Sequence, residues 1–192
     1  MATQSKAHLT EAEYLALDRT AAVRSELLDG EMFAMAGASL SHVRITGNVY
    51  AALRAQLERR GCEVFTSDLR VRVPRTGLFT YPDLVVVCGE PTLYDDEAMD
   101  TLLNPALIVE VLSSTTEAYD RGEKFAHYRT IESLEGYVLV AQDRVLVEHY
   151  ARQGDLWVLR AADRLDQTVE LASVGCELAL ADVYQRVPHA SE

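Results

Sequence analysis

Two short apolar stretches each carry a single acidic residue: YPDLVVV at residues 81–87 and LIVEVL at residues 107–112. Both are rich in β-branched side chains and bounded by Pro, Gly or Ser, a pattern that predicts buried strands. An ionised carboxylate in such a strand is costly to desolvate unless a cation neutralises it. Asp83 and Glu110 therefore predict one shared cation, a divalent metal or a lysine, and the outline of a metal-dependent hydrolase site.

Around these strands, helical and extended patterns alternate. A capping box at Thr10 predicts a short helix, Asp29-Gly30 predicts a hairpin turn, and apolar residues four apart predict a long helix ended by Gly61. The expected elements are helices over 10–17, from 39 or 41 to 60, 117–130 and 180–186, and strands within 25–35, 62–65, 69–73, 81–87 and 107–112. The second strand of the 62–73 pair alternates Arg and Val, as a half-exposed edge strand would. Residues 136–174 read as an antiparallel meander, so the fold class is α/β, a mixed α+β domain with a central sheet.

Composition limits the function classes. The 192 residues, 48% of them hydrophobic, suit one domain over 9–187, with a frayed segment at 1–8 and a tail at 188–192. The net charge of −12 argues against a protein that coats nucleic acid through a broad positive field. No run of about 18 apolar residues predicts a membrane span, and a cytoplasmic protein is the simplest interpretation. Cys62, Cys88 and Cys176 lack zinc-like spacing and are expected to be buried, reduced thiols.

Each acidic strand residue has a structural alternative. Asp83 follows Pro82 at the mouth of its strand and could reach a cleft, or could merely cap a nearby backbone amide. Glu110 shares a strand face with Ile108 and Leu112, where an unpaired acid is rare. Its alternative role is a structural ion pair with an arginine of the 69–73 strand, Arg70 or Arg72.

The helix after Glu110 offers a cation. Asp120, Lys124 and Tyr128 are four residues apart and share one helix face. Lys124 could reach back to the carboxylates and hold a water or neutralise charge in a transition state. The alternative is an ordinary surface pair between Asp120 and Lys124.

An ordered set of motifs gives these residues a family context. From about Leu9 to Val187 the chain resembles the Uma-type restriction endonuclease family, a branch of the PD-(D/E)XK nuclease superfamily. The motifs, in order, are ELLDGE (26–31), SH (41–42), YPD (81–83), VEVLS (109–113), Asp120-Arg121 with Lys124 and Tyr128, and LALADVY (178–184). No single motif is specific, but their order is.

The resemblance implies a restriction-endonuclease-like central mixed sheet flanked by helices, acting on DNA with magnesium, or manganese as a substitute. By position, Asp83 matches the Asp of the Pro-Asp motif, Glu110 the second acid, and Lys124 a lysine on the following helix. Asp83 and Glu110 would be the metal ligands, since hard carboxylate oxygens suit magnesium. The chain departs from the pattern at Leu112, where the superfamily often has lysine; at Ser114, where the family usually has proline; and at the 137 strand, which lacks the usual tryptophan.

Three further residues are candidates with open alternatives. Glu26 could be an extra ligand or an exposed strand acid beside the hairpin. His42, in the first turn of the long helix, could contact a phosphate or hydrogen-bond locally. Ser113 could donate to a carboxylate or a phosphate, or could cap the next helix.

Two function hypotheses follow. The first is a magnesium-dependent endonuclease that hydrolyses DNA phosphodiester bonds through Asp83, Glu110 and Lys124. The second is a catalytically weak or inactive nuclease-fold protein that binds a partner, which the acidic charge and Leu112 favour. Cleavage of both strands of a duplex would require two sites, so a homodimer is expected.

Overall fold

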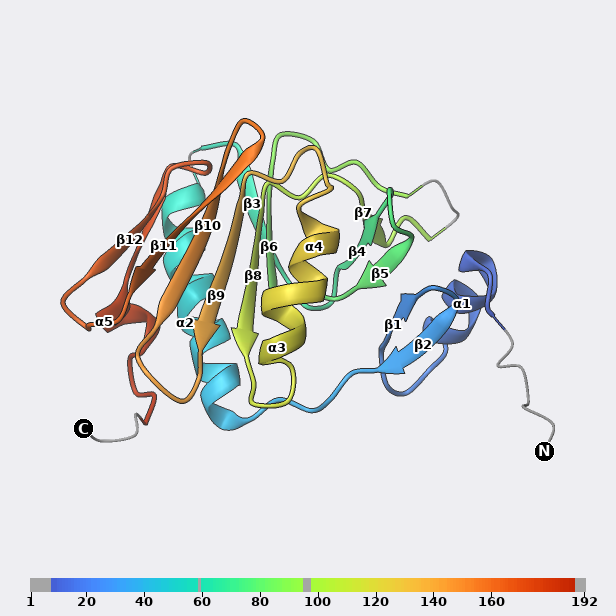
Figure 1. Cartoon of the computed structure of the whole chain (residues 1–192), viewed down its shortest axis with the longest axis horizontal. Helices are drawn as coiled ribbons and strands as arrows, with labels where there is room; N and C mark the ends of the chain where they lie inside the picture. The colour runs from blue at the N-terminus through green and yellow to red at the C-terminus, as the bar shows by residue number, and fades with distance from the viewer. Residues whose placement is uncertain (1–7, 59, 95–97, 189–192) are drawn as a thin grey trace.

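The computed structural model describes residues 8–58, 60–94 and 98–188, so most of the expected N-terminal segment and C-terminal tail lies outside the described residues. Within these ranges, two main sheets lie side by side, with a smaller pair of strands near the C-terminus (Figure 1). The larger sheet has the strand order β11-β10-β9-β8-β6-β3, and the second has the order β2-β1-β5-β4-β7. In the described ranges, no helix combines the length and apolar character needed to cross a bilayer.

The N-terminal elements form where the sequence predicts them. The capping box of Thr10 and Glu13 opens α1 (Glu11–Asp18), and β1 (Ser25–Leu28) pairs with β2 (Glu31–Ala34). Asp29 and Gly30 join these strands with φ of 48° and 75°, the left-handed geometry that Asp-Gly hairpins adopt. Helix α2 (Leu40–Leu57) starts after Ser39, whose side chain accepts from the His42 amide. It ends with Glu58 at the C-cap, three residues before Gly61.

The larger sheet contains both acid-bearing segments. Strand β6 (Leu84–Cys88) lies between β3 (Cys62–Thr66) and β8 (Leu107–Leu112), antiparallel to both. Beside β8 runs β9 (Gly136–Ala141) in parallel, followed by the antiparallel β10 (Val147–Gln153) and β11 (Leu156–Ala162). The mixed central sheet and the C-terminal antiparallel strands are therefore confirmed.

Successive side chains of β8 point to opposite faces of the sheet, and each face has its own hydrophobic core. Val109 and Val111 pack with the apolar face of α2, in the larger cluster of buried residues. Ile108 and Leu112 pack on the opposite face with Tyr128. That face is covered by a continuous helical segment made of α3 (Glu117–Tyr119), a π-helical turn (Asp120–Lys124) and α4 (Phe125–Tyr128), which Figure 1 shows in front of the sheet. Glu110 shares the face of Ile108, as the strand period requires.

The prediction of a half-exposed edge strand at 69–73 is wrong. Strand β4 (Arg70–Val73) pairs with β5 (Leu78–Thr80) on one side and with β7 (Thr101–Leu102) on the other. Arg70 is 3% exposed because Asp18 and Asp100 neutralise it at 2.8 and 3.0 Å, and Arg72 pairs with Glu11. The two arginines alternate along β4 because each forms ion pairs, with acidic residues of α1 and with Asp100. They are not the partners of Glu110.

The prediction of buried, reduced thiols is confirmed for Cys176 and is wrong for the other two cysteines. Cys62 and Cys88 form a disulfide, while Cys176 is free and buried. The antiparallel register of β3 and β6 places the two cysteines directly opposite each other, with Cα atoms 4.0 Å apart. Spacing along the chain did not reveal this proximity, because strand register decides it.

The C-terminal part contains a strand, β13 (Cys176–Ala179), beyond the expected meander of residues 136–174. Strand β12 (Thr168–Leu171) pairs with β13, and the short helix α5 (Leu180–Val183) follows directly. Residues of all three elements join the core on the α2 side of the large sheet.

Candidate active site

Asp83 is fixed at the start of β6 by two hydrogen bonds to its carboxylate. The backbone amide of Val111 donates to Oδ2 at 2.7 Å, and Nε2 of His42 lies 2.8 Å from Oδ1. The Asp83 amide in turn faces Oε2 of Glu110 at 3.3 Å. The two acidic strand residues are therefore neighbours across the β6–β8 pair.

Glu110 is 4% exposed and lies in the middle of β8. Its Oε1 accepts from Nζ of Lys124 at 3.0 Å and from the Tyr128 hydroxyl at 2.9 Å. The structural alternative for Glu110, an ion pair with Arg70 or Arg72, does not occur, since those arginines bind other acids. A cation from the following helix satisfies Glu110 instead.

Lys124 is buried among three carboxylates. Its Nζ lies 3.0 Å from Oε1 of Glu26, 3.0 Å from Oε1 of Glu110 and 3.6 Å from Oδ1 of Asp120. The shared helix face predicted for Asp120, Lys124 and Tyr128 is present despite the π-helical turn, and all three residues are buried. A solvated surface pair between Asp120 and Lys124 is excluded by this burial.

Glu26 enters this cluster from the second sheet. It lies on β1, is only 12% exposed, and accepts a hydrogen bond of 2.5 Å from Oγ1 of the buried Thr80. An exposed strand acid is therefore the wrong interpretation of Glu26. No sequence motif indicated Thr80 as part of this cluster, although its place two residues before the Pro82-Asp83 pair is a signal of proximity to the site.

His42 and Ser113 differ in their relation to the cluster. His42 bonds the Asp83 carboxylate, so its contact is neither local nor solvent-directed. Ser113 instead accepts from the Thr116 amide and contacts the hydroxyls of Thr115 and Thr116, within the turn that precedes α3. The N-cap residue of α3 is Thr116, which makes no side-chain capping bond, so Ser113 stabilises this turn and does not cap the helix itself.

The cluster holds more negative than positive charge. Burial raises the pKa of Glu110 to about 8, and the nearby carboxylates of Asp120 and Asp83 add to the rise, while Lys124 opposes it. Burial likewise raises the pKa of Asp120. Burial alone would lower the pKa of Lys124, but Glu110, Glu26 and Asp120 together raise it well above its usual value. Lys124 is therefore a persistent ammonium, and the centre favours additional positive charge.

This donor chemistry fits a magnesium ion. Asp83 and Glu110 offer hard carboxylate oxygens beside an excess of negative charge. Over the described part of the chain, no group of three or more His, Cys, Asp or Glu side chains is arranged for metal binding. Magnesium often uses one or two carboxylates and keeps several waters, so a pair of acidic ligands suits it.

Comparisons with known proteins show which folds and sequences this chain resembles. A solved structure from Anabaena variabilis, titled a putative nuclease belonging to DUF820, superposes with a TM-score of 0.74 at 18% identity, over 92% of this chain and 98% of that one. Two uncharacterized proteins of Synechocystis sp. are similar in sequence. The first, sll1609, is 40% identical over 79% of this chain and 85% of its own length. The second, slr1290, is 35% identical over 92% of each.

A family model described as "Putative restriction endonuclease" matches residues 11–181. This range includes Glu26, Asp83, Glu110 and Lys124 and spans both main sheets. The chain therefore belongs to the Uma2 family.

Proposed function

We propose that this chain is a magnesium-dependent endonuclease that hydrolyses DNA phosphodiester bonds at the cluster of Asp83, Glu110 and Lys124. The observation that carries the proposal is the buried ammonium of Lys124, 3.0 Å from Glu110, beside an acid held at the start of the neighbouring strand. Leu112 occupies the position where the superfamily often has lysine, and Lys124 supplies the missing ammonium from the helix. Membership of the Uma2 family supports the same activity.

Asp83 and Glu110 would hold the metal, which would supply Lewis-acid activation of water and charge neutralisation at the phosphorus. Lys124 would orient the attacking water or bind a non-bridging phosphate oxygen, since an ammonium has three donors. His42 and the Val111 amide position Asp83, and Tyr128 positions Glu110. Thr80 and Glu26 fix Lys124 from the opposite side.

The first test is nicking of supercoiled plasmid in magnesium or manganese. Asp83→Asn and Glu110→Gln are nearly isosteric and each removes one negative ligand, so activity should fall by at least about 100-fold with the fold intact. Asp155→Asn, at an exposed turn residue, is the matched control and should cleave like the wild type.

Thermal shift separates the two function hypotheses. Magnesium that binds the native site should raise the Tm of the wild type by mass action, and should not do so for Asp83→Asn. A wild type that binds magnesium but cleaves neither duplex nor single-stranded DNA would support the binding-module hypothesis. Equal nicking by wild type and Asp83→Asn would identify a contaminating nuclease.

The homodimer and the cytoplasmic location belong to the same proposal. Duplex cleavage would need two active sites, which a symmetric dimer provides. Sedimentation of the purified chain, with and without duplex DNA, tests the dimer directly.

A further inference from the structure

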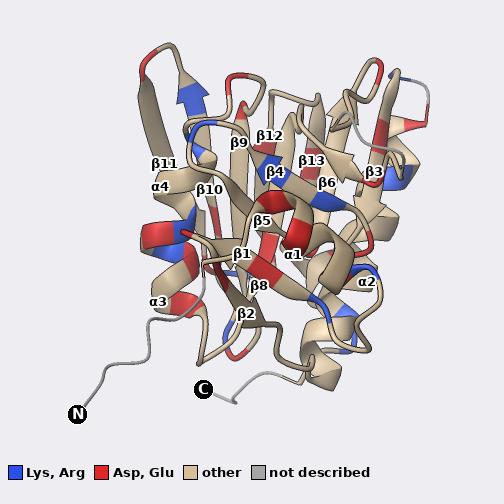
Figure 2. Cartoon of the chain, turned by 90° about the vertical axis from the view of Figure 1, so that its right-hand side faces the viewer, with Lys and Arg blue, Asp and Glu red and all other residues tan. Residues whose placement is uncertain are grey.

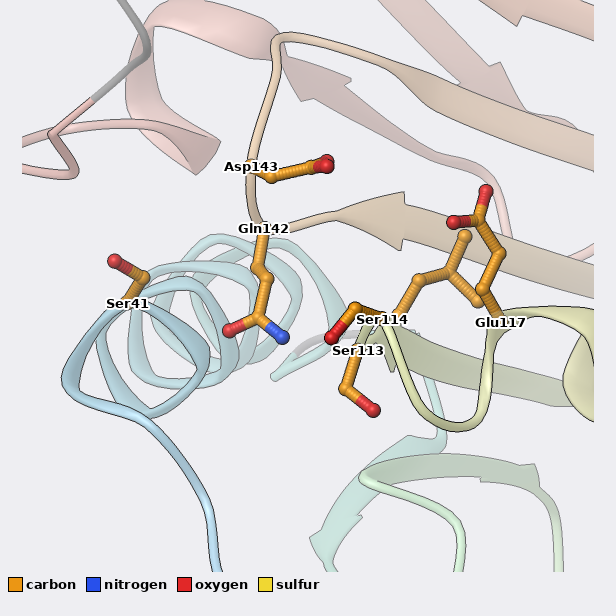
Figure 3. Close-up of a pocket in the computed structure, with 7 residues that line it drawn as sticks. Ser41, Ser113, Ser114, Glu117, Gln142 and Asp143 are labelled. Carbon is orange, nitrogen blue, oxygen red and sulfur yellow. The ribbon is translucent and has the colours of Figure 1, made fainter.

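A polar hollow of about 270 Å³ lies where the large sheet meets the start of α2 (Figure 3). Ser41 lines it from the first turn of α2, and residues 112–114 line it from the end of β8. Glu117 lies at the start of α3, and Gln142 and Asp143 follow β9. The hollow is therefore formed by the carboxyl ends of the two parallel strands and by two helix starts.

Two residues that line the hollow are sequence neighbours of the residues that hold Asp83. Ser41 precedes His42, whose Nε2 lies 2.8 Å from Asp83. Leu112 follows Val111, whose amide donates to the same carboxylate at 2.7 Å. Two residues of extended chain span about 7 Å, so Ser113, the first residue after β8, lies at most about that far from Val111. This distance is on the scale of one or two nucleotide steps, since each strand of a duplex rises about 3.4 Å per nucleotide.

The amide of Gln142 has a defined orientation. Ser39 donates to its Oε1 at 2.5 Å, which leaves the amide nitrogen to donate elsewhere. In Figure 3 this nitrogen lies on the side of Ser113 and Ser114. Gln142 therefore presents hydrogen-bond donors to the hollow from a position fixed by the helix cap.

The acceptors of the hollow are also fixed. Arg121 Nε lies 2.9 Å from Oε1 of Glu117, and an Arg144 nitrogen lies 3.0 Å from the same oxygen. The other terminal nitrogen of Arg144 is 3.0 Å from Oδ1 of Asp143. A carboxylate has about four lone-pair sites, so both acids retain acceptor capacity toward a ligand.

This combination favours a neutral ligand with donors and acceptors along one edge. Two carboxylates disfavour a phosphate, whereas Gln, Ser and acidic side chains are the groups that read nucleobase edges. The aromatic residues that stack on bases are absent from the lining, so edge recognition is the available mode. We propose that the hollow binds one keto base of the DNA, guanine or thymine, next to the cleaved phosphate, and that Gln142, which donates to the exocyclic oxygen of this base, is a specificity-determining residue. This inference rests on the proposed nuclease function.

The test is the base composition at the cut sites of a random-sequence DNA library, read by sequencing the product ends. The wild type should favour guanine and thymine over adenine and cytosine at one position beside the cut, by about ten-fold. Gln142→Ala should lose this bias while continuing to cleave. Gln142→Glu should reverse it, because the variant presents an acceptor where the amide presented a donor. Gln153→Ala, at the exposed end of β10, is the control and should keep the wild-type bias.

Cut sites without bias in the wild type, or an unchanged bias in both Gln142 variants, would overturn the inference while leaving the nuclease proposal intact. If the wild type does not cleave, the proposed function fails, and fluorescence anisotropy with homopolymers of dA, dC, dG and dT decides the inference separately. Base-dependent affinity that Gln142→Ala abolishes would support it. Equal affinities for the four homopolymers in the wild type would reject it.

Discussion

Lys124 is the residue on which the acid cluster depends. It forms ion pairs with Glu26, Glu110 and Asp120, and these carboxylates make no other ion pair with the described residues. Removing one partner of a buried ion pair leaves uncompensated charge in a low-dielectric site. Lys124 therefore has a structural role, in addition to the chemical role proposed for it above.

Lys124→Met should lower the free energy of unfolding by about 3–5 kcal/mol in metal-free buffer, because it keeps most of the side-chain volume but removes the charge. Urea unfolding at neutral pH measures the loss. Arg164→Ala, which breaks the exposed pair with Asp166, is the control and should unfold like the wild type. A Lys124→Met protein as stable as the control would show that the acids are neutralised in another way.

The local chemistry of several site residues could be predicted, but not their long-range partners. Helical register placed Asp120, Lys124 and Tyr128 on one face, and strand period placed Glu110 on the side of that helix. Glu26 could not be assigned from the sequence, because it reaches Lys124 only through the contact between two sheets. Arg70 was misread for the same reason: its partner Asp18 is 52 residues away.

Among the helices and strands, the features that depend on neighbouring residues in the sequence were predicted correctly. The pairing of strands with distant parts of the chain was not. Capping at Thr10 and the turn at Asp29-Gly30 act within a few residues, so the sequence alone specifies them. The interior position of β4, the strand β13 and the disulfide between β3 and β6 depend on neighbours that are distant in sequence. Alternating polar residues indicate an exposed face only when no buried partner neutralises them.

The disulfide makes a separate contribution at the far end of β6 from Asp83. It closes a loop of 26 residues, which the chain-entropy relation converts to about 3–4 kcal/mol of stabilisation. A reductant should therefore lower the Tm of the oxidised wild type. Cys62→Ser should start at that lower Tm and should not respond to reductant. No change in the wild type on reduction would show that the bond adds nothing to stability. Disulfides are uncommon in a reducing cytosol, so the redox state of the chain in cells also tests the predicted cytoplasmic location.

The whole molecule brings its two main sheets together at the candidate site. Figure 2 shows α1, β1 and β2 in front of the larger sheet, with acidic residues on several of these elements. Glu26 comes from one sheet, while Glu110 and the helix of Lys124 belong to the other. Because the contact is electrostatic and buried, the protonation of this cluster affects the stability of the entire fold.

Two buried groups should give the metal-free protein opposite pH responses. The pKa of Glu110 is raised from 4.5 to about 8, mainly by burial, so between these values the folded protein holds a proton that the unfolded chain releases. Stability should therefore fall as the pH rises through this range, by at most about 1.4 kcal/mol per pH unit. Burial lowers the pKa of His149 from 6.5, so stability should also fall as the pH drops below that value.

Urea midpoints across the pH range, measured in EDTA, test both responses. Glu110→Gln should reduce the fall in the urea midpoint at alkaline pH, because an amide does not titrate. It should leave the fall at acid pH unchanged. His149→Gln should flatten the acid side alone: Nε2 of His149 has no hydrogen-bond partner among the described residues, and the neutral amide takes up no proton there. Each variant thus serves as the control for the other. If the urea midpoints of the wild type and Glu110→Gln fall equally at alkaline pH, the proton that the folded protein retains above pH 4.5 is bound by a group other than Glu110.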